Sequence, residues 1–93
     1  MGKKIKSLTI CGIPFEVLYD NSIWSHGHMG RCNTIDCQIM IRGNMPDANR
    51  RSTILHEVLH IISAKMSLDL SEAQVSALEA GLYPLIANNE LSQ

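Results

Sequence analysis

The run His56-Glu57-Val58-Leu59-His60 constrains this chain more than any other feature of its sequence. It lies within a largely apolar stretch, residues 52–64, in which Glu57 is the only Asp, Glu, Lys or Arg. On an α-helix, residues four apart lie about 40° apart around the axis and roughly 6 Å apart along it. Both imidazoles would therefore leave one face of a helix whose other faces are mostly apolar. The pattern predicts a mainly buried helix whose one polar stripe is a site.

The two histidines are suited to holding a metal ion. Two neutral imidazoles can bind one zinc and leave positions for a third protein ligand and a water. Glu57 directly follows His56, so its carboxylate is expected to take a proton as a zinc-activated water attacks. The alternative is a helix with ordinary surface polar residues, but that face would then carry Lys, Arg and several Glu. We therefore expect Zn²⁺ as the cofactor, with His56 and His60 as metal ligands and Glu57 as the catalytic base.

The composition describes a single folded domain spanning residues 1–93. The chain is 45% hydrophobic and 18% charged, with a formal net charge of −1, so its overall charge does not suggest a nucleic-acid partner. No apolar stretch approaches the length of a membrane span, and no membrane association is expected. The three cysteines are odd in number and do not resemble a secreted disulfide framework. A reducing cytoplasm is the expected location.

Apolar periodicity and turn residues predict strands followed by helices. The expected elements are strands at 5–10, 13–19, 30–35 and 37–42, a helix from about Pro46 to Met66, and a helix from about Glu72 to Asn88. Asn44 or Asp47 is expected to cap the first helix, Asp69 or Ser71 the second, and Pro84 to bend the second. The predicted fold is α+β, a small antiparallel sheet of three or four strands with two packed helices on one face.

A catalytic zinc needs a third protein ligand, and no histidine follows His60. The ligand is therefore a carboxylate, and the candidates are Asp69, Glu72 and Glu79. A helical wheel turns both glutamates toward the histidine helix. They lie two turns apart, about 10 Å along the axis, which is too far for one zinc to use both.

The chain resembles the small phage-encoded relatives of the ImmA/IrrE metallopeptidase domain. Those proteins have a β-rich front, a helix of the form T-x-x-H-E-x-x-H and a second helix beginning E-x-x-V or E-x-x-A. Here Thr53, His56, Glu57, His60 and Glu72 match that pattern, and the likeness is strongest over residues 53–83. The resemblance implies a minimal zinc peptidase domain in which Glu72 is the third ligand. For a phage protein, the location would be the host cytoplasm.

Of three further residues near the motif, Glu79 and Tyr83 each allow two interpretations. Glu79 could accept a hydrogen bond from a ligand histidine, or pair with Arg50, Arg51 or a tyrosine. Tyr83 could stabilise a developing oxyanion, although a place in the core is the favoured interpretation. Thr53 could hydrogen-bond only to its own backbone.

A second set of potential ligands precedes the helix. His26, His28, Cys32 and Cys37 could form a structural zinc site, although the Cys-x4-Cys spacing is wide for one. The alternative is a histidine-containing loop followed by two strand cysteines. The strand at 30–35 could also border the cleft and pair with a peptide backbone.

The sequence therefore favours a zinc metallopeptidase that acts on a peptide or protein substrate. The alternative is a catalytically weak or inactive zincin-like scaffold that binds a phage or host protein. A nucleic-acid regulator has weaker support, because no recognition-helix pattern accompanies its basic residues, Lys3, Lys4, Lys6, Arg50 and Arg51.

Overall fold

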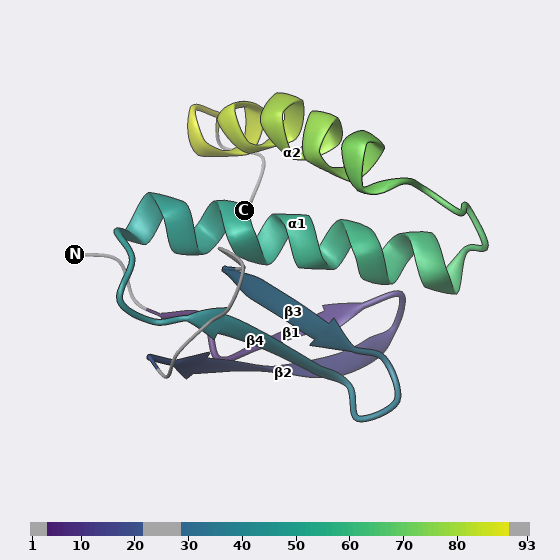
Figure 1. The fold of residues 1–93 in the computed structure, drawn as a ribbon, viewed down its shortest axis with the longest axis horizontal. Coiled ribbons are helices and arrows are strands. Elements are labelled where there is room, and N and C mark those ends of the chain that lie inside the picture. The colour runs from purple at the N-terminus through teal and green to yellow at the C-terminus, as the bar shows by residue number, and fades with distance from the viewer. Residues whose placement is uncertain (1–3, 22–28, 90–93) are drawn as a thin grey trace.

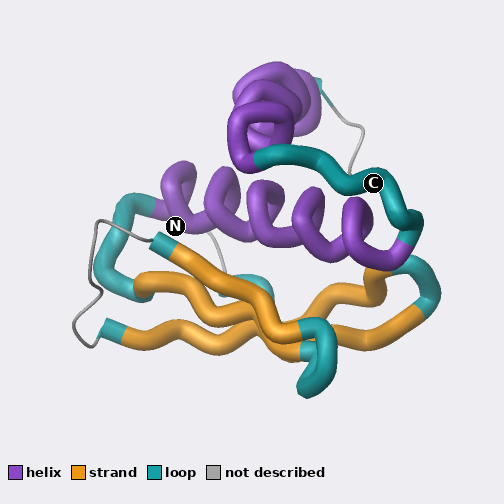
Figure 2. Tube along the Cα trace, turned by 45° about the vertical axis from the view of Figure 1, so that its right-hand side comes forward, coloured by secondary structure: helices purple, strands orange, loops and turns teal. Residues whose placement is uncertain are grey.

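The structure is a computed structural model that describes residues 4–21 and 29–89. A sheet, a helix on that sheet and a second helix on the first form three layers (Figures 1 and 2). The elements in chain order are β1 (Ser7–Ile10), β2 (Ile13–Asp20), β3 (Gly30–Asn33), β4 (Gln38–Arg42), α1 (Asp47–Lys65) and α2 (Glu72–Ala87). This order confirms the predicted α+β class.

The sheet is mixed, which corrects the prediction of a purely antiparallel one. Its strand order is β1-β2-β4-β3. The two predicted hairpins, β1/β2 and β3/β4, are antiparallel, but β2 and β4 join them in parallel, with Val17 opposite Ile39. Parallel neighbours need a crossing connection rather than a tight turn. β3 lies between β2 and β4 in the chain and forms an edge of the sheet.

The strand ends differ from those predicted by one residue at the end of β2 and the start of β4, and by two residues at the start of β1 and the end of β3. β1 begins at Ser7, although the carbonyl of Lys6 still accepts a hydrogen bond from the Val17 amide at 2.9 Å. β3 ends at Asn33 because the side-chain oxygen of Asn33 accepts from the amides of Ile35 and Asp36 at 2.9 and 3.0 Å. Such a local turn replaces the ladder bonds that would extend the strand.

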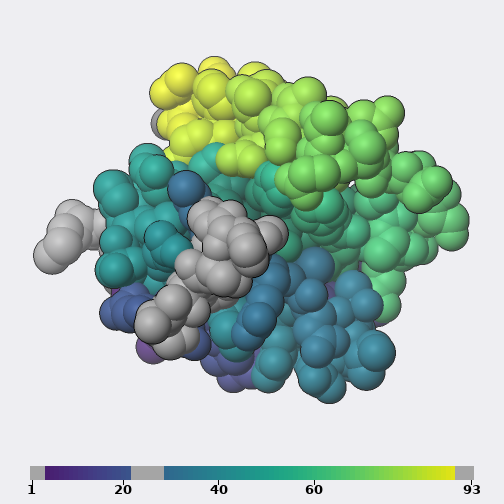
Figure 3. All heavy atoms as spheres, in the orientation of Figure 1, coloured from purple at the N-terminus to yellow at the C-terminus, as the bar shows by residue number. Residues whose placement is uncertain are grey.

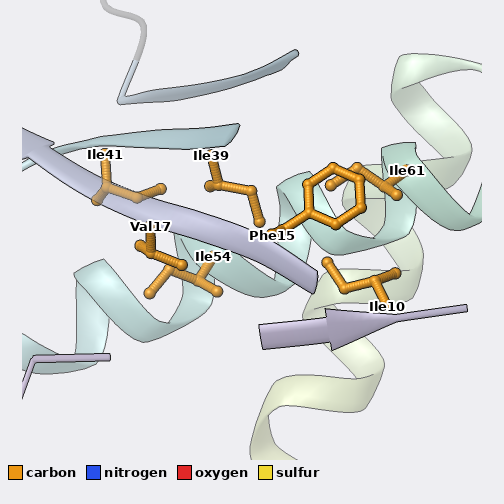
Figure 4. Close-up of a cluster of buried hydrophobic side chains, with 7 residues drawn as sticks. All are labelled: Ile10, Phe15, Val17, Ile39, Ile41, Ile54 and Ile61. Atoms are coloured by element: carbon orange, nitrogen blue, oxygen red, sulfur yellow. The ribbon is translucent and has the colours of Figure 1, made fainter. Parts of the chain in front are cut away.

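The core lies between the sheet and α1, where alternate strand residues meet one face of the helix (Figure 4). Phe15, Ile39, Ile41 and Ile61 are almost completely buried. Strand alternation places one residue in two on this inner face, and the 3.6-residue helical period supplies the matching stripe. The residues that form this cluster are Ile10, Phe15, Val17, Ile39, Ile41, Ile54 and Ile61.

The helix ends differ in how they are capped. Pro46 is the N-cap of α1 and provides no side-chain cap, so the prediction of Asn44 or Asp47 as the cap is wrong. Asp47 instead opens the helix and pairs with Arg50 and Arg51 one turn later, at 3.1 and 2.9 Å. At α2, Ser71 is the cap: its hydroxyl accepts from the Gln74 amide, and the Gln74 side chain accepts from the Ser71 amide. α2 continues through Pro84 to Ala87.

Only α1 packs on the sheet, which corrects the prediction that both helices share one face. α1 contacts β1, β3 and β4, whereas α2 contacts none of the described strands. α2 therefore packs on the far side of α1, and the space-filling view shows it as a separate layer (Figure 3). Within the described segments, no helix has the length and apolar character needed to cross a membrane.

Gly30 allows β3 to approach α1 closely. A Cβ atom at this position would lie 2.7 Å from the Cγ2 methyl of Thr53, 3.0 Å from the Cδ1 atom of Ile41 and 3.3 Å from the carbonyl oxygen of Met40. Contacts this short force the strand or the helix to move. The absent side chain at Gly30 therefore sets the distance between the edge strand and the HEVLH helix.

Gly30→Ala is expected to lower the free energy of unfolding by about 1–3 kcal/mol through overpacking. Adding Thr53→Ser removes the nearest methyl and should restore part of the loss. Gly81→Ala is the matched control, because a Cβ atom at Gly81 would have no neighbouring atom within 4 Å and alanine should stabilise the helix by about 0.5–1 kcal/mol. Urea unfolding measures all three changes. Equal stability of Gly30→Ala and the parent would contradict the close approach.

Candidate metal centre

His56 and His60 lie one turn apart on α1 and turn their rings toward each other. Their Nε2 atoms are 3.2 Å apart and their ring centroids 4.9 Å apart, in an edge-to-face arrangement. Both side chains are partly buried. The helix therefore brings together the two nitrogen atoms that the sequence spacing selected.

Glu72, the first residue of α2, reaches both histidines. Its Oε2 lies 2.7 Å from Nε2 of His56, and its Oε1 lies 2.9 Å from Nε2 of His60. The three side chains form a group whose potential ligand atoms all lie within 4.8 Å of one another. Asp69 is exposed in the connector and is not part of this group.

The short connector between the helices fixes the start of α2. The buried hydroxyl of Ser63 accepts a hydrogen bond from the Leu70 amide at 2.9 Å, and the Ser63 carbonyl accepts from the Leu68 amide at 2.9 Å. Ser67 and Asp69 both adopt a positive φ, of 55° and 54°, which turns the chain back over α1. Glu72 consequently begins its helix directly above the histidines.

Glu79 holds the other side of the His56 ring. Its Oε1 lies 2.8 Å from Nδ1 of His56, and its second oxygen accepts a hydrogen bond from the hydroxyl of Ser52. This is the contact predicted for an acceptor that orients a ligand histidine. The rival prediction of pairing with Arg50 or Arg51 is wrong, because both arginines pair with Asp47.

The two contacts of His56 define the charge that the site requires. An ionised carboxylate only accepts hydrogen bonds, so Nδ1 donates its proton to Glu79. In a neutral imidazole, Nε2 then carries a lone pair, and it faces a Glu72 oxygen at 2.7 Å. Two acceptors at this distance need a proton or a metal cation between them. The geometry therefore creates a place for positive charge between the side chains.

The electrostatics of the two groups agree with this. Burial opposes a charge on His56, but the hydrogen bond to Glu79 and the negative charges of Glu72, Glu57 and Glu79 outweigh it and raise the pKa of His56. Slight burial of Glu72 acts against its ionisation. The positive charge of His56 and the hydrogen bond from His60 outweigh that effect and lower the pKa of Glu72. Glu72 is therefore ionised and able to act as a ligand at neutral pH.

Glu57 lies beside this group but on the sheet-facing side of α1. Its side chain is 6% exposed. Burial raises the pKa of Glu57, while the charges of His56 and His60 and a hydrogen bond from Cys32 partly counter the rise. Glu57 lines an open pocket of about 650 Å³ with the three ligand candidates and with β3 residues. Its carboxyl group thus borders the same space as the cluster.

The donor set fits a zinc ion. Two imidazole nitrogens and a carboxylate oxygen are common zinc ligands, and tetrahedral bonds of about 2.0–2.1 Å place neighbouring donors about 3.3 Å apart. The separations here are 3.2 Å between the nitrogens and 2.7 to 2.9 Å from nitrogen to oxygen. Zinc would need the donors to part by only a few tenths of an ångström. Water or a substrate oxygen could complete the coordination from the pocket.

Only Cys32 and Cys37 of the rival ligand set lie within the described residues. His26 and His28 lie outside the described residues. Cys32 and Cys37 are free thiols, and the Cys37 sulfur donates to the Thr34 carbonyl at 3.8 Å. Burial and the adjacent carboxylate of Glu57 raise the pKa of Cys32 to about 11, so its sulfur stays protonated. The described part of this set does not gather into a metal-binding group.

Two other candidates lie apart from the cluster or act locally. Tyr83 is partly buried and lines a separate groove with Leu55 and Ile86, so the structure does not bring it to the metal pocket. The Thr53 hydroxyl donates to the Asn49 carbonyl at 2.7 Å, which confirms the prediction of a local backbone bond.

Ser52 and Ser63 were not identified from the sequence as parts of the site, and Cys32 was named there only as a ligand of the rival zinc site or as part of a strand bordering the cleft. Ser52 lies one turn before His56 on the same helix face, so its position could have suggested contact with the partner of His56. Ser63 and Cys32 act through the connector and the sheet. Those contacts depend on tertiary structure and leave no local pattern.

Comparison with known protein families, curated proteins and solved structures finds no match to this chain. The interpretation of the site therefore depends on the geometry and chemistry of its own residues.

Zinc affinity separates the proposed ligands from the groups around them. His56→Ala is expected to remove zinc binding. Glu72→Ala should weaken binding by more than Glu79→Ala, whose loss as an orienting partner should cost about 10–100-fold. Asp69→Ala is the control and should bind as the parent does. Competition with a coloured chelator gives each affinity, and a greater loss for Glu79→Ala than for Glu72→Ala would show that the ligand assignment is wrong.

Zinc should also hold α2 in place. Val75 is the one buried residue of α2, all of whose 16 residues are described, whereas Glu72 and Glu79 join the helix to α1 through His56. Adding a chelator to the zinc-loaded protein is expected to speed amide hydrogen exchange in α2 while β2 and β4 stay protected. Exchange that rises equally in the sheet would contradict this local coupling.

Proposed function

We propose that this protein is a zinc-dependent metallopeptidase. The observation that carries the proposal is the convergence of two imidazole nitrogens and a carboxylate beside the buried carboxyl group of Glu57. His56, His60 and Glu72 are the metal ligands, and Glu57 is the general base and acid. The resemblance to the ImmA/IrrE peptidase domain belongs to the same proposal.

The chain's residues divide the chemistry between binding and proton transfer. A zinc ion bound here would polarise the scissile carbonyl and lower the pKa of a water molecule. Glu57 accepts the proton of the attacking water on a carboxylate oxygen and passes it to the departing amine nitrogen. Burial raises the pKa of Glu57, so its carboxylate is a stronger base. The protonated carboxyl group can then return the proton near neutral pH. Glu79 keeps the proton of His56 on Nδ1 and leaves Nε2 as the ligand atom.

The edge strand favours an extended peptide as the substrate. The Arg42 amide donates to the Met29 carbonyl at 2.8 Å, just beyond the β3/β4 ladder. Bonded and non-bonded pairs alternate along antiparallel strands, so the backbone groups of Gly30 and Cys32 point away from β4. Both residues line the metal pocket. A substrate strand could pair with this edge and bring its scissile bond over Glu57.

A protein-binding scaffold is the second candidate, and the surface of α2 favours it. Leu78 and Leu85 are 41% and 47% exposed on this helix, and Ile86 is 37% exposed. Apolar side chains gathered on one helix are typical of a binding surface. In that case zinc would stabilise the fold without hydrolysis. The nucleic-acid alternative is weaker, because Arg50 and Arg51 are engaged by Asp47.

Glu57→Gln distinguishes the enzyme from the scaffold. The substitution keeps the size and much of the hydrogen bonding but removes the base, so zinc content should stay the same while cleavage falls by about 100-fold or more. The measurement is turnover of a mixed peptide library by zinc-loaded protein, followed by mass spectrometry. Glu16→Gln, on the outer sheet face, is the matched control and should cleave as the parent does. Equal turnover by Glu57→Gln and the parent would exclude the mechanism, and loss of zinc from Glu57→Gln would make the residue structural.

A further inference from the structure

Cys32 reaches the metal pocket from the sheet rather than from the helices. It lies in the middle of the edge strand β3, opposite the buried Ile39 of β4, so its side chain points to the inner face of the sheet. It is partly buried and lines the pocket that contains Glu57. The absent side chain at Gly30, two residues earlier on the same face, brings this part of β3 against α1.

Glu57 needs a partner where it lies. Glu57 as a whole residue is 6% exposed, and a buried charge is costly unless it is hydrogen-bonded or paired. The Cys32 side chain lines the same pocket as Glu57, and burial together with the adjacent carboxylate raises the pKa of its thiol to about 11, so the sulfur keeps its proton. A carboxylate accepts hydrogen bonds and a protonated thiol can donate one, so Cys32 offers Glu57 a donor from the sheet. Among the described residues of β3, Cys32 combines a hydrogen-bond donor in its side chain with a place on the inner face beside this pocket.

We propose that Cys32 is a positioning residue for Glu57, and this inference rests on the proposed function. Its S–H group holds one carboxylate oxygen against β3, so that the other oxygen faces the pocket between His56 and His60. A glutamate side chain has several rotatable bonds, and fixing one oxygen restricts the position of the other. Small displacements of a catalytic group cost large factors in rate.

Three roles for Cys32 give different results on substitution. If Cys32 is a positioning donor, serine should preserve its role because the serine O–H group also donates, and alanine should not. If Cys32 only fills space in the core, the alanine and serine variants should behave nearly alike. If the Cys32 sulfur is a metal ligand, both variants should lose it and both should bind zinc more weakly. Comparing Cys32→Ser with Cys32→Ala therefore isolates the hydrogen bond.

The test needs a readout that does not depend on peptide cleavage, and acetohydroxamic acid provides one. This small acid binds zinc through two oxygens and gives up a proton to a neighbouring carboxylate, here Glu57. Its dissociation constant is measured by calorimetry on zinc-loaded parent, Cys32→Ser and Cys32→Ala, each also combined with Glu57→Gln. Cys37→Ala, which removes a thiol of the same hairpin, is the matched control. Zinc affinity and thermal unfolding are recorded for every variant.

The expected result is that Cys32→Ala weakens hydroxamate binding by about 10-fold and lowers kcat by a similar factor, with KM and zinc affinity unchanged. Cys32→Ser should stay within about 3-fold of the parent and Cys37→Ala should match it. With Glu57→Gln present, Cys32→Ala should cause no further loss, because the group it positions is gone.

Several results would overturn the inference. These are parent-like hydroxamate binding by Cys32→Ala, equal losses in the serine and alanine variants, or a fall in zinc affinity in both. A parent that binds zinc and hydroxamate but cleaves no peptide would refute the peptidase proposal alone, since the hydroxamate comparison still decides the role of Cys32. A parent that takes up no zinc would overturn both.

Discussion

The imidazole of His56, held between two carboxylates, is the interaction on which the upper half of this structure depends. Glu79 accepts from one ring nitrogen at 2.8 Å and Glu72 faces the other at 2.7 Å, and both glutamates belong to α2. Val75 provides the one buried apolar anchor of that helix. Apolar burial alone fixes direction poorly, whereas hydrogen bonds fix register. The polar cluster therefore sets where α2 lies on α1, and a metal ion there would act on packing as well as on chemistry.

The lower half is organised by the close contact between an edge strand and the same helix. Gly30 lacks the atom that would hold β3 away from Thr53, and this proximity brings Cys32 to Glu57. Burial then raises the pKa of that carboxyl group, which suits the proposed role of Glu57 in taking and returning a proton. The properties of Glu57 thus come from the sheet beneath it, while those of His56 come from α2 above it.

Most elements and the cluster of site residues could be predicted because both follow from patterns among residues that are close together in the sequence. Phe15 and Val17 alternate along β2, the HEVLH run repeats on one helix face, and Glu72 follows it after a short turn. The parallel pairing of β2 with β4 and the layering of α2 on α1 were missed, because alternation marks a strand but not its neighbour. For Glu79 the sequence left open a ligand histidine or an arginine or tyrosine as the partner, because a helical wheel gives a direction and no distance.

A domain of this size has little apolar surface to bury, and its core and its candidate site depend on different elements. The core between the sheet and α1 is closed by Ile39, Ile41 and Ile61 without help from α2. The ligand set, in contrast, is complete only when α2 has folded back to place Glu72 over the histidines. Part of the free energy of binding a metal would therefore be used to order α2, and the affinity would be lower than for a site already formed on α1.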